Sequence, residues 1–453
     1  MRGPRPQPHR KGDRKPSPAK AIALSFFSAT MLGTLLLWLP WSHAPGQSIT
    51  LLDALFTATS ALCVTGLIVV DTASAWSPLG RVVLMLLIQI GGLGIVTLST
   101  MVALLLGRRV GFQGRLRAAA QVNASGTGGV VRLVRTIFLI SLGFETLGAL
   151  LLYPTFAALH GPGAGAFYAF FHSVSAFNNA GFALYPDSLI RFADNPVVIL
   201  VLSALFIVGG LGFIVHLNLF TRFRGGRHAP LTLHSRIALL TTLLLCAFGT
   251  LAVLGLEWSN PKTLGELPLG GKLLMGFFQG VTPRTAGFNT VDYTLLREPT
   301  LLLTMLLMFI GGSPASTAGG IKTVTFFVLV ASAWSMVRGR GELSAFGRRV
   351  AVGTVVKAGS VALLSTGLVM SALFLLSLSE SLPLLTTMFE AFSAFSTVGL
   401  SMSATFDLSG PGQFIIILLM YAGRIGPLTF ALALVQEPHA SSVKYPHEGV
   451  LIG

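Results

Sequence analysis

Eight apolar stretches, each long enough to cross a lipid bilayer, constrain the fold of this 453-residue chain more than any other feature. A transmembrane helix needs about 20 consecutive apolar residues. The stretches cover residues 20–40, 80–106, 130–153, 195–220, 231–256, 299–335, 352–377 and 412–435. Hydrophobic residues make up 53% of the chain and charged residues only 10%, which excludes a soluble enzyme, a disordered chain and a collagen-like repeat. The sequence therefore predicts an all-α polytopic membrane protein.

Basic residues gather between the apolar stretches and predict its orientation. The formal net charge of +15 comes largely from clusters within 2–20, 108–135, 222–236 and 338–357. By the positive-inside rule these clusters are cytoplasmic, and so are both termini. Residues 1–19 are basic and rich in proline, which indicates a disordered tail, and residues 436–453 form a second tail. Nucleic-acid binding is not expected, because no aromatic residues are interleaved with the basic ones.

The loops on the opposite side are rich in acidic residues. An acidic outer face would concentrate cations near a pore, although an ordinary solvated surface explains the pattern equally well. The acidic residues assigned to this side are Asp53, Asp71, Asp187, Asp194, Glu257, Glu266, Asp292, Glu298, Glu380, Glu390 and Asp407.

A fourfold internal repeat organises the whole chain. Four short apolar pieces, at 52–63, 167–177, 273–282 and 385–396, are each about half a span long and end in a stretch that contains glycine. Phe56, Phe171, Phe277 and Phe389 precede these glycines by the same interval. Ser60, Ser175 and Ser393 also share one offset, which Val281 breaks in the third repeat. Repeats at 20–106, 130–220, 231–336 and 352–435 make one membrane domain of eight transmembrane helices and four half-helices.

The four glycines predict a cation filter on a pseudo-fourfold axis. Each half-helix would end near the middle of the membrane, where its partly negative C-terminus favours a cation. Carbonyl oxygens of the following loops can then replace the hydration shell of a monovalent ion. Each glycine taken alone could be an ordinary helix C-cap, but four at matched positions favour the pore. The residues before each glycine vary, which fits a site built from main-chain oxygens. The predicted filter comprises Val64, Thr65, Gly66, Asn179, Ala180, Gly181, Thr285, Ala286, Gly287, Thr397, Val398 and Gly399.

The sixth apolar stretch contains a predicted gate. Its glycine-rich and proline-containing centre cannot form an unbroken helix, and a flexible segment there could block the filter from below. A passive kink is the alternative. The gate residues are Gly311, Gly312, Ser313, Pro314, Ala315, Ser316, Thr317, Ala318, Gly319 and Gly320, followed by Lys322. Arg424 stands where the other repeats carry the second glycine of a pair, so it is assigned to the gate or, alternatively, to a structural bridge.

Two further residues have no settled role. Glu145 is read as the clear carboxylate within a membrane stretch, and it is expected to pair with a basic residue or to face a neighbouring subunit. Arg284, three residues before a predicted filter glycine, suits a cation pathway only if its side chain points away from the axis and pairs with an acid.

Enzymatic and metal-binding motifs are absent from the sequence. It contains no HExxH, GxSxG or Walker A motif, and Cys63 and Cys246 lack metal-ligand spacing. His172 is expected to be a packed histidine of the second half-helix. The chain is therefore not expected to be an enzyme, to carry a covalently bound cofactor, or to bind a metal other than potassium.

Several motifs together resemble the Trk/Ktr/HKT superfamily of cation transporters. These motifs are TATSALCVTGL, QIGGLGIVTLST, FHSVSAFNNAGF, GVTPRTAGFNTVD, FIGGSPASTAGGIKT and YAGRIGPLTF. Eight spans resemble the Ktr branch, the membrane subunits of bacterial potassium-uptake systems. The resemblance implies potassium uptake across the bacterial inner membrane, with the intramembrane loop at Gly311–Lys322 and the gate arginine at Arg424.

The resemblance also implies partners and an ion preference. Members form homodimers in membrane lipid, with one pore per subunit. They work with a cytosolic KtrA-like ring, which binds the regulatory nucleotide in place of this chain. Contact with that ring is expected at 107–130, 221–236 and 337–350. Serine at the first filter glycine accompanies sodium transport in plant relatives, so Gly66 favours potassium. A sodium-selective transporter of the same fold is the alternative, and dependence on sodium stays open.

Overall fold

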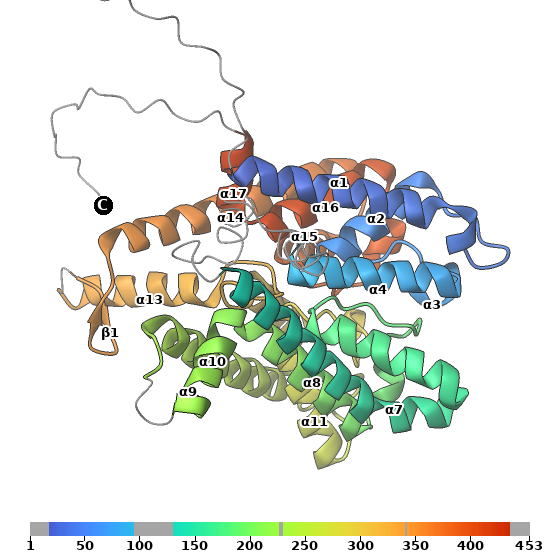
Figure 1. Ribbon diagram of the computed structural model, residues 1–453, viewed down its shortest axis with the longest axis horizontal. Coiled ribbons are helices and arrows are strands. Elements are labelled where there is room, and N and C mark those ends of the chain that lie inside the picture. The colour runs from blue at the N-terminus through green and yellow to red at the C-terminus, as the bar shows by residue number, and fades with distance from the viewer. Residues whose placement is uncertain (1–17, 95–129, 226–229, 340–341, 435–453) are drawn as a thin grey trace, which may run out of the picture.

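The structure is a computed structural model, and it describes residues 18–94, 130–225, 230–339 and 342–434 (Figure 1). The predicted tails and most of the predicted contact segment 107–130 lie outside these ranges. Helices dominate the described chain, and the one sheet found in these ranges is a short hairpin. Its strands, β1 (Ser344–Ala345) and β2 (Arg348–Arg349), pair antiparallel within the predicted contact segment 337–350.

Each repeat begins with a long helix and a shorter half-helix, as the apolar pattern predicts. The pairs are α1 (Pro18–Trp38) with α2 (Leu51–Leu62), α10 (Leu233–Glu257) with α11 (Leu269–Val281), and α14 (Val352–Ser379) with α15 (Leu384–Ser396). In the second repeat both parts lie in α7 (Val130–Phe177), where Gly161 has a φ of 78° and interrupts the helical backbone. Pro162 follows this break, at a helix start where a missing N–H costs nothing.

The second helix is broken in the second and fourth repeats, which differs from the continuous helices expected at 195–220 and 412–435. α8 (Pro196–Leu211) and α9 (Phe213–Gly225) meet at a bend of 97° around Gly212, whose φ is 91°. Gly426, with a φ of 94°, separates α16 (Gly410–Ile425) from α17 (Pro427–Leu434) in the same way. α4 (Pro78–Leu93) ends at Gly94, whose φ is 82°. Backbone at these φ values favours glycine, so each break follows from one residue.

In the third repeat the break is a longer loop. α12 (Glu298–Phe309) and α13 (Thr323–Val337) are separated by residues 310–322, as the sequence predicts for this stretch. Ile310 and Ile321 pair as an isolated parallel bridge at the base of the loop. Gly311 N–H donates to Ile321 O at 2.9 Å, and Thr323 N–H donates to Gly312 O at 3.0 Å. These bonds satisfy backbone groups that the broken helix leaves free.

The repeats close into a ring. The second helix of each repeat packs against the half-helix of the next, in the pairs α4 with α7, α8 with α11, α12 with α15 and α16 with α2. The last pair joins the fourth repeat to the first, and Figure 1 shows the blue and red repeats side by side, with the green repeats opposite them. This cyclic order is the arrangement expected of a pseudo-fourfold bundle.

The outer surface of the bundle matches a lipid environment. Four described helices are long and apolar enough to cross a membrane, and α8 with α9 makes a fifth if the bent pair is one span. Large apolar side chains face outward on these helices, among them Leu243, Leu251 and Leu363 at 67%, 69% and 76% exposure. Exposure of this kind is costly in water and favourable in hydrocarbon, so the chain is a membrane protein.

A glycine in each of three second helices lets it approach a half-helix closely. A Cβ added to Gly91 would lie 2.0 Å from Leu62 O, and one added to Gly209 would lie 1.9 Å from Phe177 O. Gly423 has the same relation to Phe395 O, at 1.8 Å. Each carbonyl belongs to the C-terminal turn of a half-helix. The glycine pairs seen in the sequence therefore hold the second helices against the ends of the half-helices.

Replacing Gly91 by alanine is expected to lower the free energy of unfolding by about 1–3 kcal/mol, because the new methyl group meets backbone that cannot move aside. Thermal unfolding of the purified protein in detergent measures this change. Gly367→Ala is the matched control, since Gly367 lies inside α14 with open space around it. That substitution is expected to be neutral or stabilising. Equal melting temperatures for Gly91→Ala and Gly367→Ala would contradict the close approach.

Candidate functional site

The four predicted filter glycines meet in one closed ring. A Cβ on Gly66 would lie 2.4 Å from Ala180 O, and a Cβ on Gly181 would lie 3.0 Å from Ala286 O. The series continues from Gly287 to Val398 O at 2.0 Å, and from Gly399 back to Thr65 O at 2.1 Å. Each glycine thus touches the carbonyl that precedes the next glycine around the ring. A side chain at any of these positions would collide with main-chain oxygen.

The backbone of the ring alternates in handedness. Two residues before each glycine, Val64, Asn179, Thr285 and Thr397 have φ values of 54°, 59°, 75° and 49°. The glycines have φ values of 92°, 68°, 77° and 96°, while the residue between keeps a negative φ. This alternation lets successive carbonyl oxygens point to the same side of the chain. Val64, Thr285 and Thr397 are β-branched, for which a positive φ is strained, and strain of this kind is typical of functional sites.

A hydroxyl group at the end of each half-helix fixes the ring backbone. Ser60 and Ser393 accept hydrogen bonds from the N–H groups of Gly66 and Gly399, both at 3.1 Å. Ser175 instead donates to Phe182 O at 2.8 Å, just after Gly181. The filter loops are therefore held by short side chains that lie behind them.

The third repeat follows the same plan with a shift of one residue, which corrects the sequence alignment. Thr282 donates to Phe288 O at 2.6 Å, so it takes the place of the missing serine that Val281 seemed to leave. Phe278 is fully buried and lies four residues before Thr282, as Phe56 lies before Ser60, whereas Phe277 is only partly buried. This shift can be found in the sequence. The buried phenylalanine precedes the hydroxyl residue by the same interval in every repeat, and only the segment from the hydroxyl residue to the glycine is one residue shorter in the third repeat.

A cavity opens on the side of the ring toward which the filter loops continue. It has a volume of about 160 Å³, and its wall includes all four filter glycines. We call it the vestibule. Further lining residues are Leu67, Ile68, Thr72, Phe182, Ala183, Tyr185, Pro186, Ser188, Asn289, Ser401, Ser403, Thr405 and Phe406.

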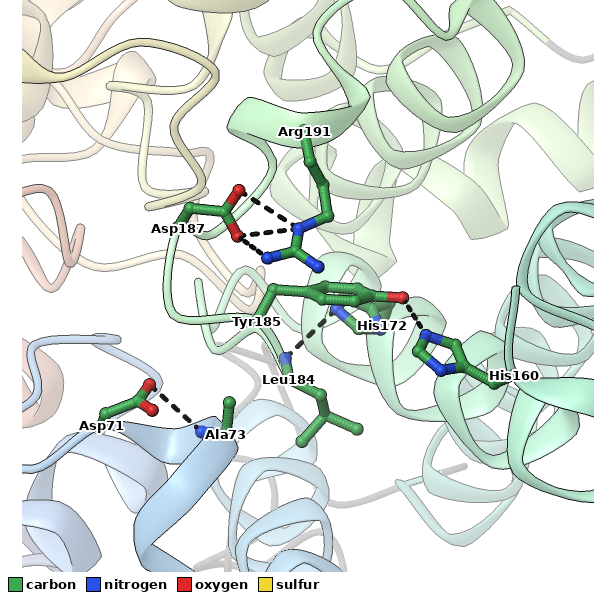
Figure 2. A network of polar contacts seen from close by, with 8 residues as sticks. All are labelled: Asp71, Ala73, His160, His172, Leu184, Tyr185, Asp187 and Arg191. Atoms are coloured by element: carbon green, nitrogen blue, oxygen red, sulfur yellow. Dashed lines mark hydrogen bonds and ion pairs between the residues drawn. The ribbon is translucent and has the colours of Figure 1, made fainter.

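Histidine and tyrosine side chains support one wall of the vestibule. Figure 2 shows Tyr185 bonded through its hydroxyl to His160 Nε2 at 2.7 Å, with Arg191 stacked on its ring. Leu184 N–H donates to His172 Nε2 at 3.3 Å (Figure 2), and His172 Nδ1 lies 2.8 Å from Tyr168 O. These partners require the Nδ1–H tautomer of His172. His172 is thus a packed, hydrogen-bonded residue, and no metal-binding cluster is found among the described residues.

The loop at 310–322 lies against the opposite side of the ring. The Thr317 hydroxyl donates to Asn179 Oδ1 at 2.8 Å, and a Cβ on Gly319 would lie 2.1 Å from Thr397 Oγ1. Ser313 N–H donates to Gly210 O at 2.9 Å, which ties the loop to the second repeat. The sequence-predicted gate residues are therefore brought directly beneath the sequence-predicted filter residues.

Two cationic side chains hold this loop through its carbonyl groups. Lys322 Nζ donates to Ala318 O at 2.6 Å and to Gly319 O at 3.2 Å. Arg424 donates to Thr317 O and also to Gly91 O at the end of α4. A guanidinium group has several donors in a rigid plane, so it can bridge two elements at once. Both readings of Arg424, as part of the gate and as a bridge between helix ends, fit this geometry.

Arg284 points away from the axis, but its partners are not acids. Its guanidinium donates to Thr242 O at 3.3 Å and Gly311 O at 3.4 Å, and it contacts the Cys246 sulfur. These carbonyls come from α10 and from the start of the 310–322 loop. Arg284 therefore joins the segment after the third half-helix to α10 and to the loop, and carbonyl groups take the place of the acidic partner that the sequence suggested.

Buried carboxylates differ from the sequence-based expectation. Glu145 is 1% exposed and accepts from Asn178 Nδ2 at 3.0 Å, so it contacts the base of the second filter loop rather than a basic residue or another subunit. Glu390 and Glu257, which the sequence pattern assigns to the acidic outer loops, are 1% and 0% exposed. Glu390 lies within the half-helix α15, inside the apolar piece predicted at 385–396, so the sequence already contained a signal for its burial.

Comparisons with known proteins agree with this architecture. The chain matches the model of the TrkH family, described as cation transport protein, over residues 10–445. It is 43% identical to Ktr system potassium uptake protein B of Bacillus subtilis, over 96% of this chain and 97% of the relative. It is 38% identical to potassium/sodium uptake protein NtpJ of Enterococcus hirae, with coverage of 96% and 97%. The crystal structure of the potassium transporter TrkH from Vibrio parahaemolyticus superposes with a TM-score of 0.73 at 19% identity, over 95% of this chain and 87% of that one, which shows a shared fold.

Replacing Thr282 by valine is expected to lower the free energy of unfolding by about 1–3 kcal/mol, because Phe288 O loses its donor in a buried position. Thermal unfolding in detergent measures the change. Thr221→Val serves as the control, since the exposed Thr221 hydroxyl bonds only to its own helix. If Thr282→Val unfolds at the same temperature as Thr221→Val, the shifted alignment of the third repeat is wrong.

Proposed function

Because the chain belongs to the TrkH family of cation transport proteins, we propose that it carries potassium into the cell through the ring of Gly66, Gly181, Gly287 and Gly399. Family membership also confirms that the chain is a transporter rather than an enzyme. The observation that carries the proposal is the closed ring of main-chain contacts on one axis. Two relatives support potassium as the ion, since both are named for its uptake.

The ring suits a partly dehydrated monovalent cation. Neutral carbonyl oxygens offer many weak ligands, which replace water without holding the ion too tightly to leave. Four half-helices end at the ring, and their C-terminal dipoles add negative potential there. Val64, Thr65 and Gly66, with their counterparts in the other repeats, would supply the oxygens.

Sodium is the competing ion. The relative NtpJ is named a potassium/sodium uptake protein, which keeps transport or coupling of sodium as a second candidate. Gly66 argues for potassium, because the resemblance links serine at this position to sodium transport. Measuring the fluxes of both ions therefore distinguishes these two candidates.

The 310–322 loop would act as the gate. It lies beneath the ring, it is held by Lys322 and Arg424, and it crosses the path that an ion leaving the filter must take. Two positive charges at this point would also repel a cation. Opening would require the Thr317–Asn179 bond and the Arg424 bridge to break together.

Assembly and orientation are part of the same proposal. The resemblance supports a homodimer and a cytosolic KtrA-like ring that binds the regulatory nucleotide. The described parts of the segments proposed to face that ring are residues 221–225, 230–236, 337–339 and 342–350, the last of which contains the hairpin β1–β2. Arg222, Arg236, Arg348 and Arg349 lie in them, and by the positive-inside rule these residues support a cytoplasmic location for this end and for both termini. The vestibule then faces outward at the bacterial inner membrane.

Replacing Gly66 by serine is expected to reduce the ratio of potassium to sodium flux by about tenfold, because the added side chain meets Ala180 O inside the ring. Isotope uptake into proteoliposomes measures both ions. Gly46→Ser is the matched control, since Gly46 has a φ of 80° but open space around it. An unchanged ratio for folded Gly66→Ser counts against the filter, and absence of potassium uptake by the wild-type protein rejects the proposed function.

Deleting Ser313–Gly319 is expected to raise basal potassium flux several-fold, because the segment beneath the ring is removed. Thr317→Val, which removes the hydroxyl that contacts Asn179 Oδ1 and Phe177 O, should raise it less. Thr294→Val removes an exposed hydroxyl bond to Asp292 and is the control. A deletion variant that elutes like the wild type yet shows equal or lower flux would exclude the loop as a gate.

A further inference from the structure

One position in each half-helix carries a buried polar side chain. It directly follows the buried phenylalanine of the repeat and is occupied by Thr57, His172, Gln279 and Glu390. These residues are 0%, 0%, 2% and 1% exposed. The one-residue shift in the third repeat is needed to see the equivalence, because Gln279 follows Phe278. Buried polar groups are retained where they have partners, so the partners indicate what this position does.

Three of the four side chains bond to the chain segment that leaves the ring. His172 accepts from Leu184 N–H, and Gln279 bonds the hydroxyl groups of Thr290 and Tyr293 at 3.0 and 2.6 Å. Glu390 bonds the hydroxyl groups of Ser401 and Thr405. This position therefore supports the vestibule wall from behind in the second, third and fourth repeats.

Glu390 differs from its counterparts in being a carboxylic acid. Thr405 Oγ1 donates to Glu390 Oε2 at 2.8 Å, Ser401 Oγ donates to Glu390 Oε1, and Met402 N–H donates to the same group. Every one of these partners is a donor, which is what an ionised carboxylate requires. A hydroxyl group whose hydrogen is directed at a carboxylate presents its free lone pairs on the other side.

The two residues whose hydroxyl groups bond Glu390 lie at the vestibule. Ser401 and Thr405 both line the vestibule together with the four filter glycines. Their oxygens are 3.0 Å apart, at hydrogen-bond distance from each other and close enough for one ion to contact both. The carboxyl group of Glu390 lies directly behind them, in a buried place where water screens its charge little when the group is ionised.

We propose that Glu390 is a positioning residue that turns the Ser401 and Thr405 oxygens toward the vestibule, where they bind a hydrated alkali cation before it enters the ring. This site rests on the proposed function, because it collects the ion that the filter then dehydrates. The oxygen ligands and the negative potential of this site come from the fourth repeat alone. It should therefore set the concentration at which transport is half-saturated rather than the maximal rate.

The experiment measures rubidium uptake into proteoliposomes as a function of rubidium concentration. Glu390→Gln keeps the shape but removes the charge, and its amide group must donate to one of the hydroxyls. Thr405→Val removes one oxygen with little change of volume. Both variants are expected to raise KM by about tenfold while the maximal rate changes less than about twofold. Ser377→Ala, which removes an exposed hydroxyl on α14, should leave both constants unchanged.

Each other outcome overturns the proposal. An unchanged KM in either variant shows that the charge and the hydroxyl do not act as one site. A lower maximal rate at unchanged KM shows that Glu390 only stabilises the fold. If Glu390→Gln does not fold, Thr405→Val decides alone through its KM. Failure of the proposed function is separate, since the wild-type protein would then take up no rubidium.

Discussion

The rest of this structure depends on one constraint, which is the need to expose main-chain carbonyl oxygens at the centre of a membrane. A helix uses all its carbonyl groups internally, so a pore built from carbonyls needs backbone that leaves the helix at membrane depth. The chain meets this need with half-helices that stop at the ring and loops that alternate in handedness. Hydroxyl groups behind the loops, such as those of Ser60 and Thr282, bond the backbone groups that the loop itself cannot pair. Positive φ at Val64 and Thr397 is tolerated because these surrounding contacts leave no alternative conformation.

The repeats are equivalent in geometry more than in sequence. The third repeat is one residue shorter between Thr282 and Gly287, yet its hydroxyl reaches the carbonyl that follows the glycine, as Ser175 does in the second repeat. The close contacts of Gly91, Gly209 and Gly423 with half-helix carbonyls likewise recur in three repeats. Where the third repeat lacks such a contact, Gly311 lies against Gly319 O within its own loop. The four repeats therefore share one geometry at the ring of glycines, and they differ beneath it, where the third repeat carries the 310–322 loop.

The sequence predicts the parts of this fold that depend on local pattern. Apolar length gives the half-helices to within a few residues, and the repeated glycines identify the loops that meet on the axis. It did not predict the breaks at Gly212 and Gly426, because one glycine in an apolar helix is usually tolerated and only the repeat comparison distinguishes these two. The contacts of Glu390 were also not predicted, because its partners Ser401 and Thr405 come after the half-helix in the sequence. Whether they reach Glu390 depends on the path of the loop. The partners of Arg284 and Glu145 are tertiary contacts between repeats, which periodicity does not encode.

The position of the 310–322 loop also bears on why four repeats share one polypeptide. Thr317 and Gly319 touch residues of the second and fourth repeats, and Arg424 reaches both this loop and Gly91 of the first. A loop of this size near a rotation axis cannot be present in four symmetric copies, because the copies would occupy the same volume. Four identical polypeptides could share the ring but not the loop. Fusion into a single gene product frees one unit to diverge, so that a single loop can lie beneath a ring to which all four repeats contribute.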